Sequence, residues 1–527
     1  MDKNTLQTQH NIPFVQLLVA IVLFIAASIV AYPYYQYYID PDAVAYLTIA
    51  RRYAEGDYLR AVNGLWSPFH PWLVALCMKQ GMDGLWAAQI TNGIACALVL
   101  VCVFFLFRRF KIHRSVSWAF MITLPAFMTY CLFKQLFDDV WQVVFLLCYL
   151  LLITSRNFIS QPWKWVLCGL IGALAFYAKT YSIYFISLHL PVVTYLLSGR
   201  DRKKPRRWIL PYVTTLVTLW LLLIPWLFAM HEKYGRWALS NAGDINHSWT
   251  LKGRKTFDPS IKHLIPPPYE DSPCNMEDPY FNEPHYFKPW ESVQLFGAQI
   301  VRSTLSVAQG LLVINEMSSL LLAVLLISAY FLFFRKDQQI FGVNHAILVW
   351  ASLIAPIGYV LLHFEARYIW ILGYSGIILG SVWLMYLRKY VTQRGLWYAL
   401  VWMYALSFVS YGFYDMKLLF KKGEDIYLQA QEINKLGLKG SYTSNDKPTR
   451  APATALLTGC PYYTIEYPDF PHHELLEEMR RYKVKYYFFY HQPHDAPNIN
   501  FVDENGNPFP ELTGGNISGL KIFEINP

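Results

Sequence analysis

The sequence has 527 residues, of which 55% are hydrophobic and 17% aromatic, while only 15% are charged. This composition excludes a soluble globule with a normally charged surface, so lipid must be the solvent for much of the chain. The formal net charge of +9 does not indicate nucleic-acid binding, because the basic residues stand in short clusters between apolar runs. That arrangement is typical of residues that set membrane topology.

Apolar runs recur along most of the chain. A helix needs about 20 apolar residues to cross the hydrocarbon core, and a scan in chain order finds about eleven such runs. The expected spans are 14–33, 85–107, 115–133, 140–155, 163–178, 181–198, 208–230, 317–334, 342–362, 368–387 and 396–414. The first run lacks a small-residue cleavage site, so we expect a retained helix and not a signal peptide.

Basic clusters between the expected spans predict the orientation. They are Arg108, Arg109, Lys111 and Arg114; Arg156 and Lys164; Arg200 to Arg207; Arg335 and Lys336; and Arg388, Lys389 and Arg394. All of them fall on one side of the membrane if the N-terminus is inside, and basic residues favour the cytoplasmic side. The sequence thus predicts a multi-pass protein of the plasma (inner) membrane, with a cytoplasmic N-terminus and the C-terminal region outside.

Two domains follow from this topology. Residues 1–414 form an all-α polytopic transmembrane domain with outer loops 34–84 and 231–316, and residues 415–527 form a small α/β domain on the extracytoplasmic, or periplasmic, side. The end of the second loop, Trp290 to Ile314, has the pattern of an amphipathic helix at the interface. In the tail, alternation and helical spacing predict a strand over Gly440–Ser444, a helix over His472–Lys483 and a strand over Val484–Tyr490.

Two carboxylates, Asp40 and Asp42, flank Pro41 just after the first expected span. Charge near the bilayer is costly, so ionisable residues there are candidate functional groups. One acid could act as a general base for an acceptor hydroxyl while the other orients it or holds a divalent cation, Mg²⁺ or Mn²⁺. Alternatively, both are solvated acids that cap a helix predicted over Ala43 to Glu55.

The residues that follow favour the functional interpretation. They are Tyr46, Ala50, Gly56 and the run from Ser67 to Leu73, which contains His70. Together with Asp42 they resemble the first outer loop of the GT-C superfamily of glycosyltransferases, the group that includes protein O-mannosyltransferases and the aminoarabinose transferases acting on lipid A. In that family the loop carries an acidic residue four positions before a tyrosine. The resemblance therefore implies that Asp42 is the catalytic base.

Three further segments match the family in the expected order and on the expected side. They are Phe137-Asp138-Asp139, the segment from Gly169 to Thr180 that contains Lys179, and His363-Phe364-Glu365-Ala366-Arg367-Tyr368. The first departs from the family, in which a Ser-Glu type of pair is commoner. The resemblance covers roughly residues 14–390, and the tail matches only the kind of accessory domain that many members carry.

The resemblance implies an inverting hexosyl- or pentosyltransferase with a polyprenyl-phosphate-linked sugar as donor and a protein, lipid or polysaccharide hydroxyl as acceptor, at the outer membrane face. Lys179 and Arg367 suit the leaving phosphate, since lysine offers a point charge and arginine a two-pronged fork. The other expected substrate-binding residues are Asp40, Tyr46, His70, Asp138, Asp139, His363, Glu365 and Tyr368.

Structural alternatives exist for the same side chains. Lys179 could snorkel to the interface, and Arg367 could form a structural bridge with Glu365 or Asp138. Asp138 and Asp139 could cap the fourth span. Histidines in such positions, here His70 and His363, are more often structural than catalytic.

Two other functions fit the composition. A glycan polymerase or ligase would use a lipid-linked oligosaccharide, and a lipid or sugar transporter, or flippase, would move its substrate unchanged. Transporters often carry charges near the bilayer midplane and broken helices. Here the ionisable residues gather at one membrane face, which favours a site at the outer surface.

Overall fold

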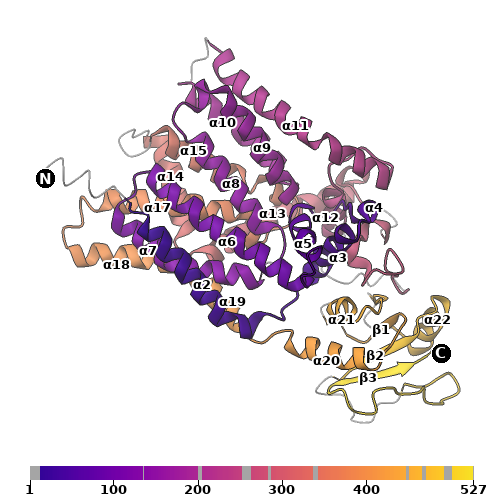
Figure 1. The fold of residues 1–527 in the computed structure, drawn as a ribbon. Coiled ribbons are helices and arrows are strands. Elements are labelled where there is room, and N and C mark those ends of the chain that lie inside the picture. Colours follow the sequence, from indigo (N-terminus) through magenta and orange to yellow (C-terminus); the bar gives the residue numbers. More distant parts are fainter. Residues whose placement is uncertain are drawn as a thin grey trace.

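The computed structural model describes residues 12–134, 136–199, 204–251, 263–282, 286–335, 342–446, 450–465, 470–491 and 501–525. Most of this chain is helical, and a small sheet lies beyond one end of the helical bundle, near the C-terminus (Figure 1). The basic residues Arg200 to Lys203 and Lys336, used to predict orientation, lie outside the described residues.

Long apolar helices build the bundle. They are α2 (Val15–Tyr35), α6 (Gly84–Arg109), α7 (Arg114–Lys134), α8 (Asp139–Ile153), α9 (Pro162–Ala178), α10 (Ser182–Leu197), α11 (Arg206–Tyr234), α13 (Val293–Met317), α14 (Leu321–Tyr330) with the π-helix Phe331–Arg335, α15 (Val343–Ile354), α16 (Ile357–Val360), α17 (Trp370–Leu387), α18 (Arg394–Ser407) and α19 (Ser410–Leu418). Each expected span coincides with one of these helices or with two in succession. The predicted all-α polytopic fold with a small C-terminal sheet is confirmed.

Eight helices of the described chain are long and apolar enough to cross a membrane, and shorter apolar helices accompany them. The eight include Val293–Met317, which the sequence pattern predicts as an interfacial helix. The helix begins three residues later and ends three residues later than the predicted segment, and its length and composition suit either position. Its Gln299 and Gln309 side chains donate to the carbonyls of Leu361 and Phe364, so α13 packs along the segment that leads into α17.

The segment between α2 and α6 folds into α3 (Pro41–Glu55), α4 (Tyr58–Ala61) and α5 (Phe69–Met78). Helix α3 begins where the sequence offers a cap, because Asp40 accepts from the backbone of Asp42 and Pro41 is set for the first helical position. It ends at Gly56, whose φ of 84° places it in the left-handed region that glycine adopts without strain. The predicted helix was thus short by two residues at its start.

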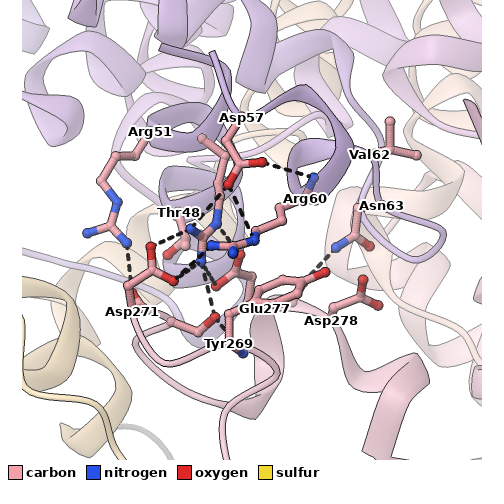
Figure 2. A network of polar contacts seen from close by, with 12 residues as sticks. Thr48, Arg51, Asp57, Arg60, Val62, Asn63, Tyr269, Asp271, Glu277 and Asp278 are labelled. Atoms are coloured by element: carbon pink, nitrogen blue, oxygen red, sulfur yellow. Dashed lines mark hydrogen bonds and ion pairs between the residues drawn. The ribbon is translucent and has the colours of Figure 1, made fainter. Parts of the chain in front are cut away.

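A buried arginine ties α3 to the loop between α11 and α13. The Arg52 side chain is 1% exposed, and its guanidinium forms paired bonds with Asp271 at 2.6 and 2.9 Å and bonds Glu277 through Nε at 2.8 Å. Beside it, Asn63 donates to the carbonyl of Glu277 (Figure 2). Lys233 of α11 pairs with Asp278. This network, named here the Arg52 network, holds α3, the loop and α11 together.

The C-terminal region contains α20 (Glu424–Lys435), α21 (Arg450–Thr458), α22 (His472–Arg481) and the strands β1 (Tyr442–Ser444), β2 (Tyr486–Tyr490) and β3 (Leu520–Glu524). The sheet order is β1-β2-β3, with β1 parallel and β3 antiparallel to β2. The first two strands and α22 match the predicted segments. Helix α19 continues to Leu418, past the expected domain boundary at 415.

The core of this C-terminal region continues into α3. Ile39, Ala43 and Val44 belong to the same buried apolar cluster as Tyr442 and Phe488 of the sheet. Burial of apolar side chains is the main favourable term in folding. The helix that begins with Asp42 is therefore supported on one side by the C-terminal region and on another by the Arg52 network.

Candidate active site

The start of α3 separates the two acids that flank Pro41. Asp40 caps the helix, since its Oδ1 accepts from the Asp42 amide at 3.0 Å and its Oδ2 accepts from the Tyr38 hydroxyl at 3.1 Å. The Asp42 side chain makes no cap and points instead toward the start of α17, where it meets Arg367. Asp40 thus caps the helix, as the structural alternative predicts for both acids, whereas Asp42 is free of capping and remains the functional candidate.

Arg367 is the centre of an ion-pair cluster. Its Nη2 lies 2.9 Å from Oδ2 of Asp42, its Nε 2.5 Å from Oε2 of Glu365, and its Nη1 3.9 Å from Oδ2 of Asp139. The guanidinium also stands 4.5 Å from the centre of the Phe137 ring, which adds a cation–π contact. Only 14% of the Arg367 side chain is exposed.

Lys179 brings a second cation to the same group. Helix α9 ends at Ala178, and Lys179 follows in an extended conformation at its C-cap. Its ammonium forms an ion pair with Oδ1 of Asp139 and lies 4.0 Å from the centre of the Tyr368 ring. Asp139 thus touches both cations. The structure therefore brings Asp42, Asp139, Lys179, Glu365 and Arg367 together, from four separate segments of the chain.

Arg367 and Lys179 have N–H groups that are not used within the cluster. A guanidinium carries five N–H groups and an ammonium three. Arg367 uses one N–H in a hydrogen bond to Asp42, while its ion pairs with Glu365 and Asp139 and the ion pair of Lys179 leave further N–H groups available. An incoming anion can be bound without breaking every existing pair. Tyr368, which also stacks on Tyr359 at 5.0 Å, covers Lys179 with its ring.

Asp42 and Glu365 differ in pKa, and therefore in how readily each accepts a proton. Burial raises the pKa of Asp42, as do the charges of Asp40 and Glu365, and the charge of Arg367 only partly opposes this, so the pKa is about 6. Burial would also raise the pKa of Glu365, but Arg367 outweighs it, with smaller contributions from His363 and Lys179, and the pKa is about 2. Asp42 is therefore the better proton acceptor of the two near neutral pH.

Asp138 and His70 lie beside this cluster in a buried structural arrangement. The His70 amide donates to Oδ1 of Asp138 at 2.8 Å, and the His70 ring bonds the Thr91 hydroxyl at 2.9 Å. Burial raises the pKa of Asp138 well above its ordinary value. These contacts tie α5 to the start of α8 and to α6, which favours the structural interpretation of His70.

The remaining predicted residues line the cluster. Tyr46 stacks on Phe137 with ring centres 5.8 Å apart, and Phe137 in turn faces Arg367. His363 is partly exposed and its Nε2 lies 3.4 Å from Oε1 of Glu365. Sequence reasoning missed Phe137 and Tyr359 as parts of the site, because aromatic residues near helix ends look the same as interface residues.

A divalent cation has few ligands here. The described residues hold no group of three or more His, Cys, Asp or Glu side chains placed to bind a metal ion. Asp40 is occupied by capping and Asp42 by Arg367. Between Asp42 and Asp139, the position that a cation would take is filled by the guanidinium of Arg367.

Comparisons with known proteins bear on this arrangement. A family model for dolichyl-phosphate-mannose-protein mannosyltransferases matches residues 66–228, the part that contains His70, Asp138, Asp139 and Lys179. A comparison with curated protein sequences finds no match.

The fold is also seen in solved structures of ArnT, a GT-C glycosyltransferase, from Cupriavidus metallidurans. The structure bound to undecaprenyl phosphate matches with a TM-score of 0.57 and 12% identity, over 97% of this chain and 97% of that chain. The apo structure matches with a TM-score of 0.51 and 12% identity, over 96% and 97%. The chain thus has the fold of ArnT, as the resemblance of its motifs predicts, and its eight long apolar helices agree with a multi-pass membrane protein.

Proposed function

We propose that this protein is an integral-membrane glycosyltransferase that moves one sugar from a polyprenyl-phosphate carrier to an acceptor hydroxyl at the outer face of the plasma membrane. The observation that carries the proposal is the pairing of Asp42 with Arg367, with Lys179 reaching the same group through Asp139. A carboxylate that can accept a proton lies near two cations that can bind a leaving phosphate, and these are the residue types that such a reaction needs.

The reaction is a single displacement. The acceptor oxygen attacks the anomeric carbon while its proton passes to Oδ1 of Asp42, since the hydrogen bond from Arg367 goes to Oδ2. The bond between the anomeric carbon and the phosphate oxygen breaks, and its electron pair leaves with the polyprenyl phosphate. Attack from the face opposite the leaving group inverts the anomeric configuration.

The leaving phosphate gains negative charge, which costs most where water is scarce. Arg367 and Lys179 supply donors for its oxygens, and their shared carboxylate Asp139 holds both in place. Asp139 is nearly inaccessible, with 3% of its side chain exposed, whereas 24% of the Asp42 side chain is exposed. Exposure therefore favours Asp42 over Asp139 as the base, and the higher pKa favours Asp42 over Glu365.

The donor class is supported by the similar proteins. The matching family model describes dolichyl-phosphate-mannose-protein mannosyltransferases, and the ArnT structure holds undecaprenyl phosphate. Both names point to a polyprenyl-type phosphate carrier. An outer-face site agrees with the basic clusters, which stand at the opposite helix ends from Asp42, such as Arg108 and Arg109 at the end of α6.

The test is the variant Asp42→Asn, assayed in membranes with radiolabelled polyprenyl-phosphate sugars. We expect label to leave the carrier with the wild type and the rate to fall by at least about 100-fold in the variant. Glu55→Gln, at the exposed end of the same helix, is the matched control and should keep full activity. Full activity of Asp42→Asn in a correctly inserted protein would end the proposal. Product mass, one sugar added or many, distinguishes a transferase from a polymerase.

A further inference from the structure

A cavity of about 720 Å³ lies at the other end of the helices that form the candidate active site. Helix α8 begins at Asp139 and α10 begins just after Lys179, and both end at the cavity, which Leu151 and Leu197 line. The 15 residues of α8 span about 22 Å at the rise of an α-helix. The cavity is therefore separate from the cluster around Arg367.

The polar lining of this cavity is basic. Its cations come from the end of α6 and from the turn after α8, and they are Arg108, Arg109, Lys111 and Arg156. Uncharged polar groups complete the lining, namely Thr154, Ser155, Asn157 and Asn344. No acidic side chain stands among these described lining residues. The cavity is here named the basic cavity.

The arginines of the basic cavity have no acidic partner in the part of the chain that the structure describes. Arg108, Arg109 and Arg156 form no ion pair with an acidic residue in the described ranges of the chain. The C-terminal ends of α6, α8 and α10 offset part of the charge, but three helix ends sum to only about −1.5 elementary charges. The three arginines alone exceed that, so the described lining of the basic cavity keeps a net positive charge that favours an anion.

A role in topology alone does not explain the arrangement. Basic residues at a membrane boundary set orientation from any position in a loop, and that role needs neither a cavity nor a convergence of cations from two loops. Lys164 shows the contrast, since its ammonium is used locally, donating to the Arg156 carbonyl and the Ser155 hydroxyl at the end of α8. Arg109 and Arg156 instead face a space large enough for a ligand.

We propose that the basic cavity binds a phosphate group. Arginine forks match the paired oxygens of a phosphate, and the amides of Asn157 and Asn344 can donate further hydrogen bonds. The volume lies within the range of small-molecule sites. The phosphate comes either from the head group of an anionic lipid or from a soluble phosphate compound, and a basic cavity between helices at a membrane boundary suits the lipid source.

The test compares lipid retention in nanodiscs that mix phosphatidylglycerol with phosphatidylcholine, read by native mass spectrometry. We expect the wild type to retain phosphatidylglycerol and the double variant Arg109→Gln/Arg156→Gln to retain it about tenfold more weakly, the change that losing charge-assisted hydrogen bonds produces. The matched control Arg114→Gln/Arg394→Gln removes the same charge from exposed positions at nearby helix starts outside the cavity and should behave as the wild type.

A second variant tests the cavity itself without removing any charge. Leu197→Trp fills the cavity while all four cations remain, and it should also lose retention. Inorganic phosphate added to delipidated protein forms the other arm: thermal stabilisation of the wild type but not of the double variant would identify a soluble source.

Equal retention by the wild type, the double variant and Leu197→Trp, with no response to inorganic phosphate, would overturn the proposal, as would loss in the control pair to the same extent. Neither readout measures sugar transfer, so the result stands apart from the proposed function.

Discussion

Arg367 binds Asp42 across 325 residues of sequence, with Nη2 2.9 Å from Oδ2. The pair joins the start of α17 to the start of α3, so a residue late in the helical bundle fixes the carboxylate that emerges after the first helix. It also sets the protonation of that carboxylate, because the guanidinium lowers a pKa that burial and the neighbouring acids raise.

The first prediction concerns pH. Asp42 must be ionised to accept a proton, and its pKa is about 6. Activity should therefore be constant above neutral pH and fall as the pH drops through about 6. A pH profile of kcat/KM measures this. A profile that stays flat well below pH 6 would show that another group is the base.

The second prediction uses Arg367→Gln to move that profile. Loss of the guanidinium removes the main influence that lowers the pKa of Asp42. The acidic limb of the profile should shift to higher pH, and the maximal rate should fall by about 100-fold because one donor to the leaving phosphate is gone. If the rate falls but the acidic limb of the pH profile does not shift, Arg367 acts on the phosphate alone.

The third prediction concerns Lys179. Lys179→Gln keeps a hydrogen-bond donor but removes the charge that pairs with Asp139. We expect kcat to fall by about 100-fold with a smaller change in KM, since the charge is most needed when the phosphate leaves. Lys164→Gln, a buried lysine at the other end of α9, serves as the control. Equal loss in both variants would indicate a structural effect.

The fourth prediction concerns divalent cations. Arg367 occupies the space between Asp42 and Asp139, and it provides the positive charge that a bound metal ion would otherwise bring to the phosphate. Transfer should therefore continue at the same rate after treatment with EDTA. Loss of activity that Mg²⁺ or Mn²⁺ restores would contradict this and would place a metal ion in the site.

The fifth prediction concerns stability. Arg52→Met leaves Glu277, which is 2% exposed, as an uncompensated buried charge, and removing one partner of a buried ion pair costs about 3–5 kcal/mol. The melting temperature should fall. Adding Glu277→Leu to the variant should restore part of the loss, since no unpaired charge remains at that position. No recovery in the double variant would show that Asp271, and not Glu277, depends on Arg52.

Much of the bundle could be predicted from the sequence, because apolar runs of membrane length have no other stable environment. The helix over Val293–Met317 shows the limit: its sequence fits both an interfacial and a spanning helix. Its contacts with residues 361–364 could not be read from the sequence. Strand β3 was not predicted, because a short strand is identified mainly by its partner, here β2.

The candidate site was predicted by resemblance and not by local pattern. Nothing in the segment around Asp40 says which acid caps the helix, because either could accept from the backbone. Lys179 and Asp139 are paired although they lie 40 residues apart in the sequence. The spacing of two residues that far apart does not tell how close they are in space. Arg52 looked like any charge on an amphipathic helix, since its burial depends on residues 271–277 of the second loop.

The long reach between Asp42 and Arg367 constrains how the protein is made. As the chain is synthesised, the carboxylate emerges 325 residues ahead of its guanidinium partner, and the apolar surface around Ala43 and Val44 must wait still longer for Tyr442 and Phe488. If synthesis stops before Arg367 is made, Asp42 has no guanidinium partner and the apolar surface of α3 stays uncovered. The candidate active site is therefore completed only late in synthesis. A chain that stalls earlier would expose the apolar surface of α3, which quality-control factors could recognise.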